Sequence, residues 1–288
     1  MVSPIVIAGP TGSGKSEFAI ILAEKQDGEI ICADSRQIYA GMQIGTASPT
    51  LQDHARIPHH NYNVVNPTES YDAGRFIEDT NRAIQDICKR NKIPILVGGT
   101  GLYLRCWRFG LSDVPQRDLT IRAQLNGELE LNGLAALYQE LKIMDEESAR
   151  HIDQNDAFRI IRALEIIRIT GKKASELRSS HFTSPKQEAK WILIQVARED
   201  LNKRIMSRTK KMFENGIVEE AIALRHALPP HHRLLDTIGY KESLDYADGH
   251  IDLDDELPLI DFGEHFPVEF RHDENSNQER GDRDPDDF

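Results

Sequence analysis

The sequence predicts an α/β fold in which a parallel sheet with crossover helices carries a P-loop and is interrupted by an inserted helical domain. Three observations lead to this fold class. Short apolar runs alternate with helical patterns over about the first hundred residues. A glycine-rich loop separates the first apolar run from the first helical pattern. The segment 113–183 is helical in pattern and contains no good strand.

The elements of the core are expected in chain order on both sides of the insert. Apolar runs predict the strands, at 5–8, 30–33, 93–97 and 191–196. Apolar residues at helical spacing predict the core helices, at 15–26, 72–90 and 200–225. The expected domains are 1–112 for the first part of the P-loop core, 113–183 for the inserted helical domain, 184–244 for the second part of the core, and 245–288 for an acidic, poorly ordered tail.

The strongest motif occupies residues 9–16, GPTGSGKS, and matches G-x-x-x-x-G-K-[ST] in full between a strand and a helix. Its glycines let backbone N–H groups wrap a diphosphate, and the amino terminus of the following helix adds a positive field. Lys15 adds a point charge, and the Ser16 hydroxyl is a suitable ligand for Mg²⁺. The motif leaves open whether the diphosphate belongs to a nucleotide or to another substrate.

Two further segments follow predicted strands, and open parallel sheets bind ligands at that edge. They are 34–37 (DSRQ) and 98–101 (GGTG). Asp34 is the only acidic residue at these strand ends. Three interpretations of it remain open: the carboxylate that orders Mg²⁺-bound water in nucleotide hydrolases, a general base facing an acceptor, and an ordinary turn or capping Asp.

Composition excludes several classes of protein. No apolar run approaches the roughly 20 residues of a membrane-spanning helix, so an integral membrane protein is not expected. The amino terminus lacks the parts of a secretory signal, and we therefore expect a cytoplasmic protein. Cys32, Cys88 and Cys106 are odd in number and lack C-x-x-C spacing, which argues against a disulfide framework or a zinc cluster.

The net charge of -12 is concentrated at the carboxyl end. Residues 245–288 contain 16 Asp and Glu against three Arg and no Lys, so the rest of the chain is close to neutral. An acidic protein is a poor partner for nucleic acid because phosphate binding needs local positive charge, but the body of this chain is not acidic. The tail has little apolar periodicity after Phe270, and we expect it to be solvated or disordered.

The insert contains a helix with both a core stripe and a basic face. Over 155–170, apolar residues at helical spacing form one stripe, and Gly171 is a suitable terminator. The stripe consists of Ala157, Ile160, Ile161, Leu164 and Ile167. The basic residues off the stripe are Arg159, Arg162, Arg168, Lys172 and Lys173. They suit RNA phosphates, or they form an ordinary solvated face.

With these motifs in view, the chain resembles the tRNA dimethylallyltransferases from about Ile5 to Glu242. Besides the loop, the matching segments are 34–39 (DSRQIY), 41–42 (GM), 44–47 (IGTA), 58–60 (PHH), 98–103 (GGTGLY), 155–156 with Arg159 and 162–165, Arg204 with Arg208, and 238–242 (IGYKE). The resemblance implies transfer of a dimethylallyl group from dimethylallyl diphosphate to N6 of the adenine adjacent to the anticodon, with Mg²⁺ as cofactor and with release of diphosphate.

The roles of the family's residues carry over to the matching positions. The donor diphosphate is expected to bind Gly9, Pro10, Thr11, Gly12, Ser13, Gly14, Lys15 and Ser16, of which Ser16 also binds the metal. The expected catalytic residues are Asp34 as general base, Lys15, Thr100 and Arg208. The residues expected to bind tRNA are Asp34, Ser35, Arg36, Gln37, Thr100, Arg122, Phe158, Arg159, Ile160, Ile161, Arg162, Gly239, Tyr240 and Lys241. The resemblance further implies that the insert grips the anticodon stem and loop. We expect a monomer with no membrane partner.

The carboxyl end departs from the family's pattern. Members continue after the GYKE segment with an AKRQ run and a nearby Trp, and neither follows Leu244. A lineage-specific ending and a truncated or frame-altered product both explain the difference, and either would weaken RNA binding and stability. The alternative functions are a P-loop small-molecule kinase, an adenylate isopentenyltransferase, and an inactive RNA-binding remnant.

Overall fold

The structure is a computed structural model that describes residues 2–111, 114–179 and 184–252. Two compact units make up the chain. The first comprises Met1–Tyr71, Thr80–Gly101 and the chain from Ala189 onward, and the second comprises Asp72–Asp79 and Leu102–Glu188. Most of the tail predicted to be poorly ordered, residues 253–288, lies outside the described residues.

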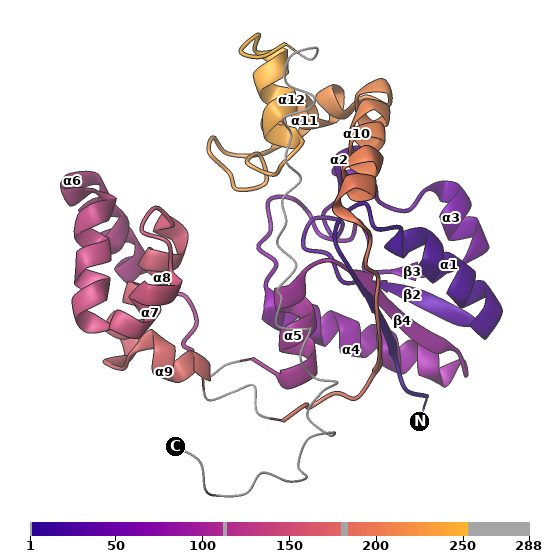
Figure 1. Cartoon of the computed structure of the whole chain (residues 1–288), viewed down its shortest axis with the longest axis horizontal. Coiled ribbons are helices and arrows are strands. Elements are labelled where there is room, and N and C mark those ends of the chain that lie inside the picture. The colour runs from indigo at the N-terminus through magenta and orange to yellow at the C-terminus, as the bar shows by residue number, and fades with distance from the viewer. Residues whose placement is uncertain (1, 112–113, 180–183, 253–288) are drawn as a thin grey trace, which may run out of the picture. The chain divides into compact units, whose positions relative to one another are not determined.

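The first unit is built on a five-stranded parallel sheet in the order β3-β2-β4-β1-β5 (Figure 1). Its strands are β1 (Ile5–Ala8), β2 (Gly28–Cys32), β3 (His59–His60), β4 (Ile93–Gly98) and β5 (Lys190–Leu193). The four predicted strands and the α/β fold class are confirmed. The register pairs Ala8 with Gly98 and Cys32 with Val97, so the carboxyl ends of β1, β4 and β2 meet at one edge.

The helices of the first unit are α1 (Lys15–Gln26), α2 (Gln43–Thr46), α3 (Leu51–Arg56), α10 (Arg198–Glu214), α11 (Ile217–Ala227) and α12 (Tyr240–Ala247), while α4 (Ala73–Lys89) belongs partly to each unit. They include two that were predicted, α1 and α4, and three short ones that were not, α2, α3 and α12. The prediction of a single helix over 200–225 is wrong. Gly216 adopts a φ of 93° and separates α10 from α11, because a left-handed residue ends the regular backbone of a helix.

One core cluster of the first unit lies between α1 and the sheet, and Figure 1 shows α1 running along the strands. Ala19 and Ala23 of α1 are buried against apolar residues of the strands, including Ile7, Ile30 and Ile95. Small residues on the helix allow this close packing, which fixes α1 and the loop before it relative to the sheet.

The second unit is helical, as the sequence predicts for the insert. Its helices are α5 (Gly101–Phe109), α6 (Leu119–Met144), α7 (Glu146–His151), α8 (Ala157–Thr170) and α9 (Ala174–Ser179). Asp118 and Asp156 cap α6 and α8 by accepting hydrogen bonds from backbone N–H groups. Gly171 ends α8 in the left-handed conformation, with φ of 68°, as predicted. Four of the five stripe residues of α8 pack into a core with leucines of α6, Leu125, Leu137 and Leu141; the four are Ile160, Ile161, Leu164 and Ile167.

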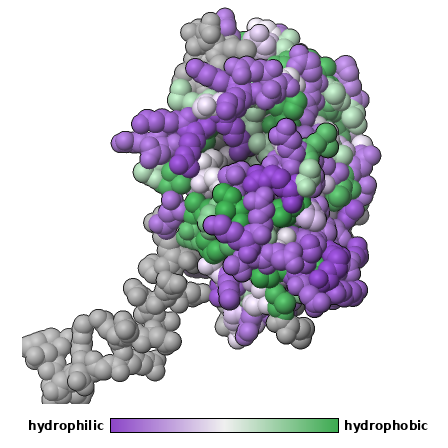
Figure 2. All heavy atoms as spheres, turned by 90° about the vertical axis from the view of Figure 1, so that its right-hand side faces the viewer, coloured by the Kyte–Doolittle hydropathy of each residue, from purple (hydrophilic) through white to green (hydrophobic). Residues whose placement is uncertain are grey.

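The surface drawn in Figure 2 is mainly hydrophilic, with hydrophobic residues in separate small groups. Across the described residues, every helix is too short or too polar to cross a lipid bilayer.

Candidate active site

The phosphate loop connects β1 to α1 and folds as its motif predicts. Gly12 and Gly14 adopt φ angles of 79° and 90°, which L side chains rarely adopt. The Ser13 N–H donates to the Pro10 carbonyl at 3.2 Å, and the Lys15 ammonium donates to the same carbonyl at 2.7 Å. These bonds hold Lys15 over the loop at the start of α1. The loop therefore presents the N–H-lined turn and the lysine that a diphosphate requires.

A cavity of about 330 Å³ opens in front of the loop, at the carboxyl edge of the sheet. All of its walls come from the first unit. They are formed by Thr11, Gly12, Gly14, Lys15, Ser16, Glu17, Asp34, Gln37, Thr46, Ala47, Val97, Gly98, Arg204 and Arg208. The structure thus brings together the predicted loop, the predicted carboxylate and the predicted Arg208.

Asp34 follows β2, and its carboxylate is held by the turn that it starts. Oδ1 accepts hydrogen bonds from the N–H groups of Arg36 at 2.8 Å and Gln37 at 3.3 Å. Within the described part of the chain, Oδ2 accepts no hydrogen bond. The turn therefore fixes the carboxylate and leaves one oxygen available to a ligand in the cavity.

Thr100 ties the loop after β4 to the loop after β2. The Ser35 N–H donates to Thr100 Oγ1 at 2.9 Å, and the Thr100 N–H donates to the Ala33 carbonyl at 3.3 Å. The two strands approach so closely that a Cβ on Gly98 would lie 1.9 Å from the Ala33 oxygen. Thr100 is not among the residues that line the cavity, so its position supports Asp34 through the neighbouring Ser35.

Two arginines on α10 complete the cationic side of the cavity. The Arg208 guanidinium donates to the Thr46 carbonyl at 3.1 Å, and the Arg204 guanidinium donates to the Ser13 carbonyl at 3.4 Å. Arg204 was not predicted as a site residue. Its signal in the sequence is the spacing of four from Arg208, which places both side chains on one face of the helix.

Burial and charge shape the electrostatics of this cavity. Burial lowers the pKa of Lys15 to about 8, although the Asp34 carboxylate acts in the opposite direction; Arg208 lowers it further. Burial also lowers the pKa of Arg208, and Asp34 again opposes the change. The Asp34 carboxylate therefore does not fully offset the cost of burying the positive charges of Lys15 and Arg208. A bound diphosphate would add negative charge beside both groups.

Comparison with sequence models of protein families shows to which family this chain belongs. A sequence model of the IPP transferase family matches residues 37–262, which is more than half of the chain. The chain belongs to the IPP transferase family. A model of the isopentenyl transferases matches residues 3–59, which include the phosphate loop. The IPP transferase match extends beyond Glu242, where the resemblance found in the sequence ends.

Individual IPP transferases are similar over most of the chain. A tRNA dimethylallyltransferase of Geobacter sulfurreducens is 42% identical over 258 residues, covering 89% of this chain and 83% of the relative. The solved structure of the full-length tRNA isopentenylpyrophosphate transferase of Bacillus halodurans is 32% identical, with a TM-score of 0.61 and coverage of 90% and 82%. A eukaryotic dimethylallyltransferase, in crystallographic snapshots of its action on tRNA, is 33% identical, with a TM-score of 0.74 and coverage of 90% and 66%.

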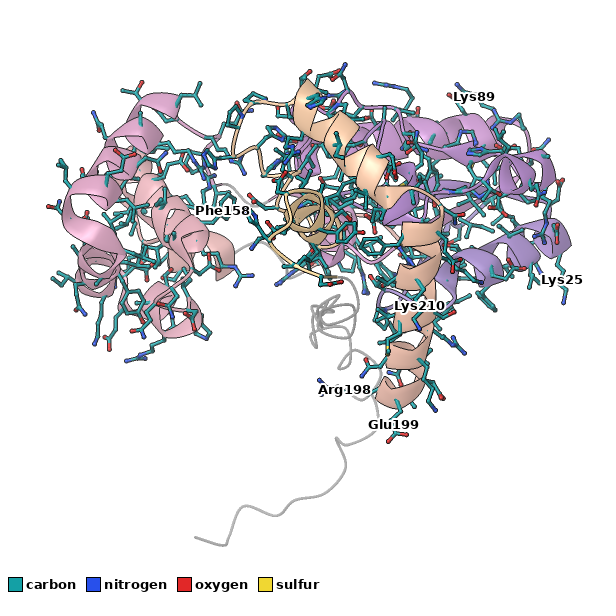
Figure 3. All side chains as sticks on the ribbon, turned by 90° about the horizontal axis from the view of Figure 1, so that it is seen from above. Lys25, Lys89, Phe158, Arg198, Glu199 and Lys210 are labelled. Atoms are coloured by element: carbon teal, nitrogen blue, oxygen red, sulfur yellow. The ribbon has the colours of Figure 1, made fainter. Side chains whose placement is uncertain are left out.

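The helical unit of this IPP transferase presents an exposed aromatic ring beside two arginines. Phe158 is 56% exposed at the start of α8, and Figure 3 shows it at the edge of the unit. The Cζ atoms of Arg122 and Arg117 lie 5.3 Å and 5.7 Å from the centre of its ring. Arg159 is exposed on the next position and pairs with Asp156 at 3.2 Å. An exposed ring with flanking guanidinium groups is a suitable stacking surface for an unpaired base.

A buried carboxylate holds two of the predicted RNA-binding arginines. Glu165 is fully buried and accepts hydrogen bonds from Arg162 at 2.8 Å, Arg122 at 3.3 Å and the Asp118 N–H at 2.9 Å. Arg162 also donates to the Pro115 carbonyl at 2.6 Å. These contacts stabilise the helical unit, so Arg162 contributes less free charge than the sequence suggested.

Several predicted RNA-binding residues have side chains that do not reach the surface. Ile160 and Ile161 are buried in the helical core, as their membership of the apolar stripe requires. Tyr240 is fully buried in the first unit. Arg168, assigned to the basic face, pairs with Glu128 and Glu140 at 2.7 Å and 3.0 Å instead. Gly239 is the N-cap residue directly before α12, and the side chain of Lys241 is exposed.

Proposed function

We propose that this chain transfers a dimethylallyl group from dimethylallyl diphosphate to N6 of the adenine adjacent to the anticodon of tRNA. The observation that carries the proposal is that Lys15 and Asp34 line one cavity in a member of the IPP transferase family. The names of its relatives, which are tRNA dimethylallyltransferases, support the same reaction. The proposal includes a monomeric protein that acts on tRNA in the cytoplasm.

The chemical step requires a base and a stabilised leaving group. Adenine N6 attacks C1 of the donor, so that a C–N bond forms while the C–O bond to the diphosphate breaks. The diphosphate leaves with the electron pair of that bond. The proton that N6 loses passes to the Asp34 carboxylate, whose Oδ2 is the available oxygen. An exocyclic amine is a weak nucleophile, and removing this proton lowers the barrier to attack.

The phosphate loop and the cations stabilise the departing diphosphate. The loop contributes backbone N–H groups, and Lys15, Arg204 and Arg208 contribute positive charge from two helices. The side chains of Lys15, Arg204 and Arg208 are held in place by their hydrogen bonds to the carbonyl groups of Pro10, Ser13 and Thr46. Fixed charges at the position where negative charge develops are an effective means of stabilising a transition state.

The residues around the cavity fit Mg²⁺. The Ser16 hydroxyl lines the cavity and supplies an oxygen donor, the ligand type that Mg²⁺ prefers. Ser16 would hold the ion, and bound Mg²⁺ neutralises negative charge on phosphate oxygens. Among the described residues, no group of three or more His, Cys, Asp or Glu could hold a metal by itself. This donor set suits an ion that takes further ligands from the diphosphate and water.

The proposal is tested by incubating the purified protein with labelled dimethylallyl diphosphate, Mg²⁺ and an anticodon hairpin. Label should enter the hairpin and should not enter a hairpin in which that adenine is replaced by guanine. Transfer to AMP but not to the hairpin would instead identify an adenylate isopentenyltransferase. Stabilisation by ATP with none by dimethylallyl diphosphate, measured as a shift in melting temperature, would identify a kinase.

A further inference from the structure

The carboxylate of Glu220 receives hydrogen bonds from the amino terminus of α2. The N–H of Ile44 lies 3.0 Å and 2.9 Å from the two carboxylate oxygens, and the N–H of Gly45 donates to Oε1 at 3.0 Å. Glu220 is on α11, far from these residues in the sequence. A negative charge at this end of a short helix satisfies N–H groups that have no partner within the helix.

Tyr240 adds a second contact to the same carboxylate and presses on the same helix. Its hydroxyl donates to Glu220 Oε1. A Cβ on Gly45 would lie 2.4 Å from the Tyr240 ring, so only glycine allows the ring to lie this close to the backbone. Burial raises the pKa of the Tyr240 hydroxyl, which therefore stays protonated and able to donate. The pair thus fixes α2 by hydrogen bonds and by direct packing.

The carboxyl end of α2 forms part of the cavity. The Thr46 carbonyl accepts hydrogen bonds from Arg208 at 3.1 Å and from the Gln37 side chain at 3.0 Å. The Gln37 side chain also donates to the Ala47 carbonyl at 3.0 Å. Within the described residues Arg208 makes no ion pair, so the Thr46 carbonyl is what directs its guanidinium.

We propose that Glu220 is a positioning residue that orients Arg208 toward the donor diphosphate through α2. Glu220 and Tyr240 fix one end of a helix of a single turn, and the other end holds the guanidinium. A helix this short transmits a displacement of its amino terminus to its last carbonyl because few bonds lie between them. The inference rests on the proposed function, because it assumes that Arg208 contacts the diphosphate.

The test measures binding of inorganic diphosphate to Glu220→Gln by calorimetry, with no RNA and no transfer step. Glutamine keeps the size of the side chain but offers one acceptor oxygen and no charge. The affinity should fall by about tenfold, the usual size of a lost charge-assisted hydrogen bond that orients a ligand group. Glu219→Gln is the matched control, because Glu219 is the exposed neighbour on α11, and its affinity should stay within about twofold of the wild type.

A double-mutant cycle separates positioning from a general effect on folding. In an Arg208→Ala background, Glu220→Gln should weaken diphosphate binding by less than about twofold further, because the group it orients is gone. Additive losses would overturn the proposal. If Glu220→Gln does not fold, Tyr240→Phe removes one hydrogen bond and keeps the ring, and it should show a smaller loss with the same non-additivity. A wild-type protein that binds diphosphate but transfers nothing to the hairpin would contradict the proposed function alone.

Discussion

Lys15 and Asp34 line one cavity. They follow β1 and β2, which are not neighbours in the sheet, since β4 lies between these two strands. The loop after β1 brings the ammonium to this edge, and the turn after β2 brings the carboxylate. The field of Asp34 favours the ammonium form of Lys15, while burial opposes it more strongly. The cavity therefore contains both a base, Asp34, and a cation, the Lys15 ammonium, which a bound diphosphate would stabilise.

The lowered pKa of Lys15 predicts a pH dependence of diphosphate binding. Burial lowers this pKa to about 8, so the ammonium is mostly present at neutral pH and is lost as the pH rises through about 8. Only the ammonium form of Lys15 attracts diphosphate. Bound diphosphate in turn raises the pKa of Lys15, so binding near pH 8 is accompanied by uptake of a proton. Calorimetry should show an affinity that falls from pH 7 to pH 9.

The matched variant for this effect is Lys15→Arg, whose side chain stays charged throughout the range. The affinity of this variant for diphosphate should change less between pH 7 and pH 9 than that of the wild type, because the arginine does not lose its charge. The titration of diphosphate itself affects both proteins equally. Lys25→Arg, at the exposed last turn of α1, should behave as the wild type does. Equal pH dependence of the wild type and Lys15→Arg would contradict the assigned pKa.

Phe158→Ala should lower the affinity for an anticodon hairpin by about tenfold, because stacking of one base on an aromatic ring contributes about 1–3 kcal/mol. The ring is more than half exposed, so the melting temperature should change little. Fluorescence anisotropy with a labelled hairpin measures the affinity. Leu131→Ala, which removes an exposed apolar side chain of α6, is the control. Equal affinities of the two variants would exclude Phe158 from the RNA interface.

Gly98→Ala should destabilise the sheet by about 3 kcal/mol, a large effect for a single methyl group. The added carbon would lie 1.9 Å from the backbone oxygen of Ala33, and backbone cannot move aside as a flexible side chain can. Gly127→Ala is the control, because Gly127 lies within α6 with nothing near the added carbon. Urea unfolding should show the first variant weakened and the second unchanged or slightly stabilised; equal midpoints would contradict this explanation.

The elements predicted best are those whose pattern is local. The limits of α1 agree with the prediction because the phosphate loop fixes its start and Asp27, in the left-handed conformation, follows its end. The two-residue β3 and the short α2 and α3 carry too few residues to show a period. The break at Gly216 was missed because apolar residues continue on both sides of it, and one glycine within a helical pattern is ambiguous.

In the candidate site too, the residues marked by local sequence patterns could be predicted, and those that depend on long-range contacts could not. The loop and Asp34 could be located from the sequence, because a motif and a strand end mark them. The pairing of Arg168 with Glu128 and Glu140 joins residues far apart in the sequence, and only the fold brings them together. The burial of Tyr240 against Gly45 is of the same kind. Sequence motifs therefore located the phosphate loop and the carboxylate. Long-range contacts determine which of the predicted basic side chains are already paired with carboxylates.

The most direct test of the account compares the wild type with Asp34→Asn in the transfer of labelled dimethylallyl to an anticodon hairpin. Asparagine keeps an oxygen for the turn but cannot take a proton, so transfer should fall by about a thousandfold, within the usual range for a general base. Diphosphate affinity should stay within about threefold, since the loop and the cations are unchanged. Transfer by Asp34→Asn at the rate of the wild type would contradict the account.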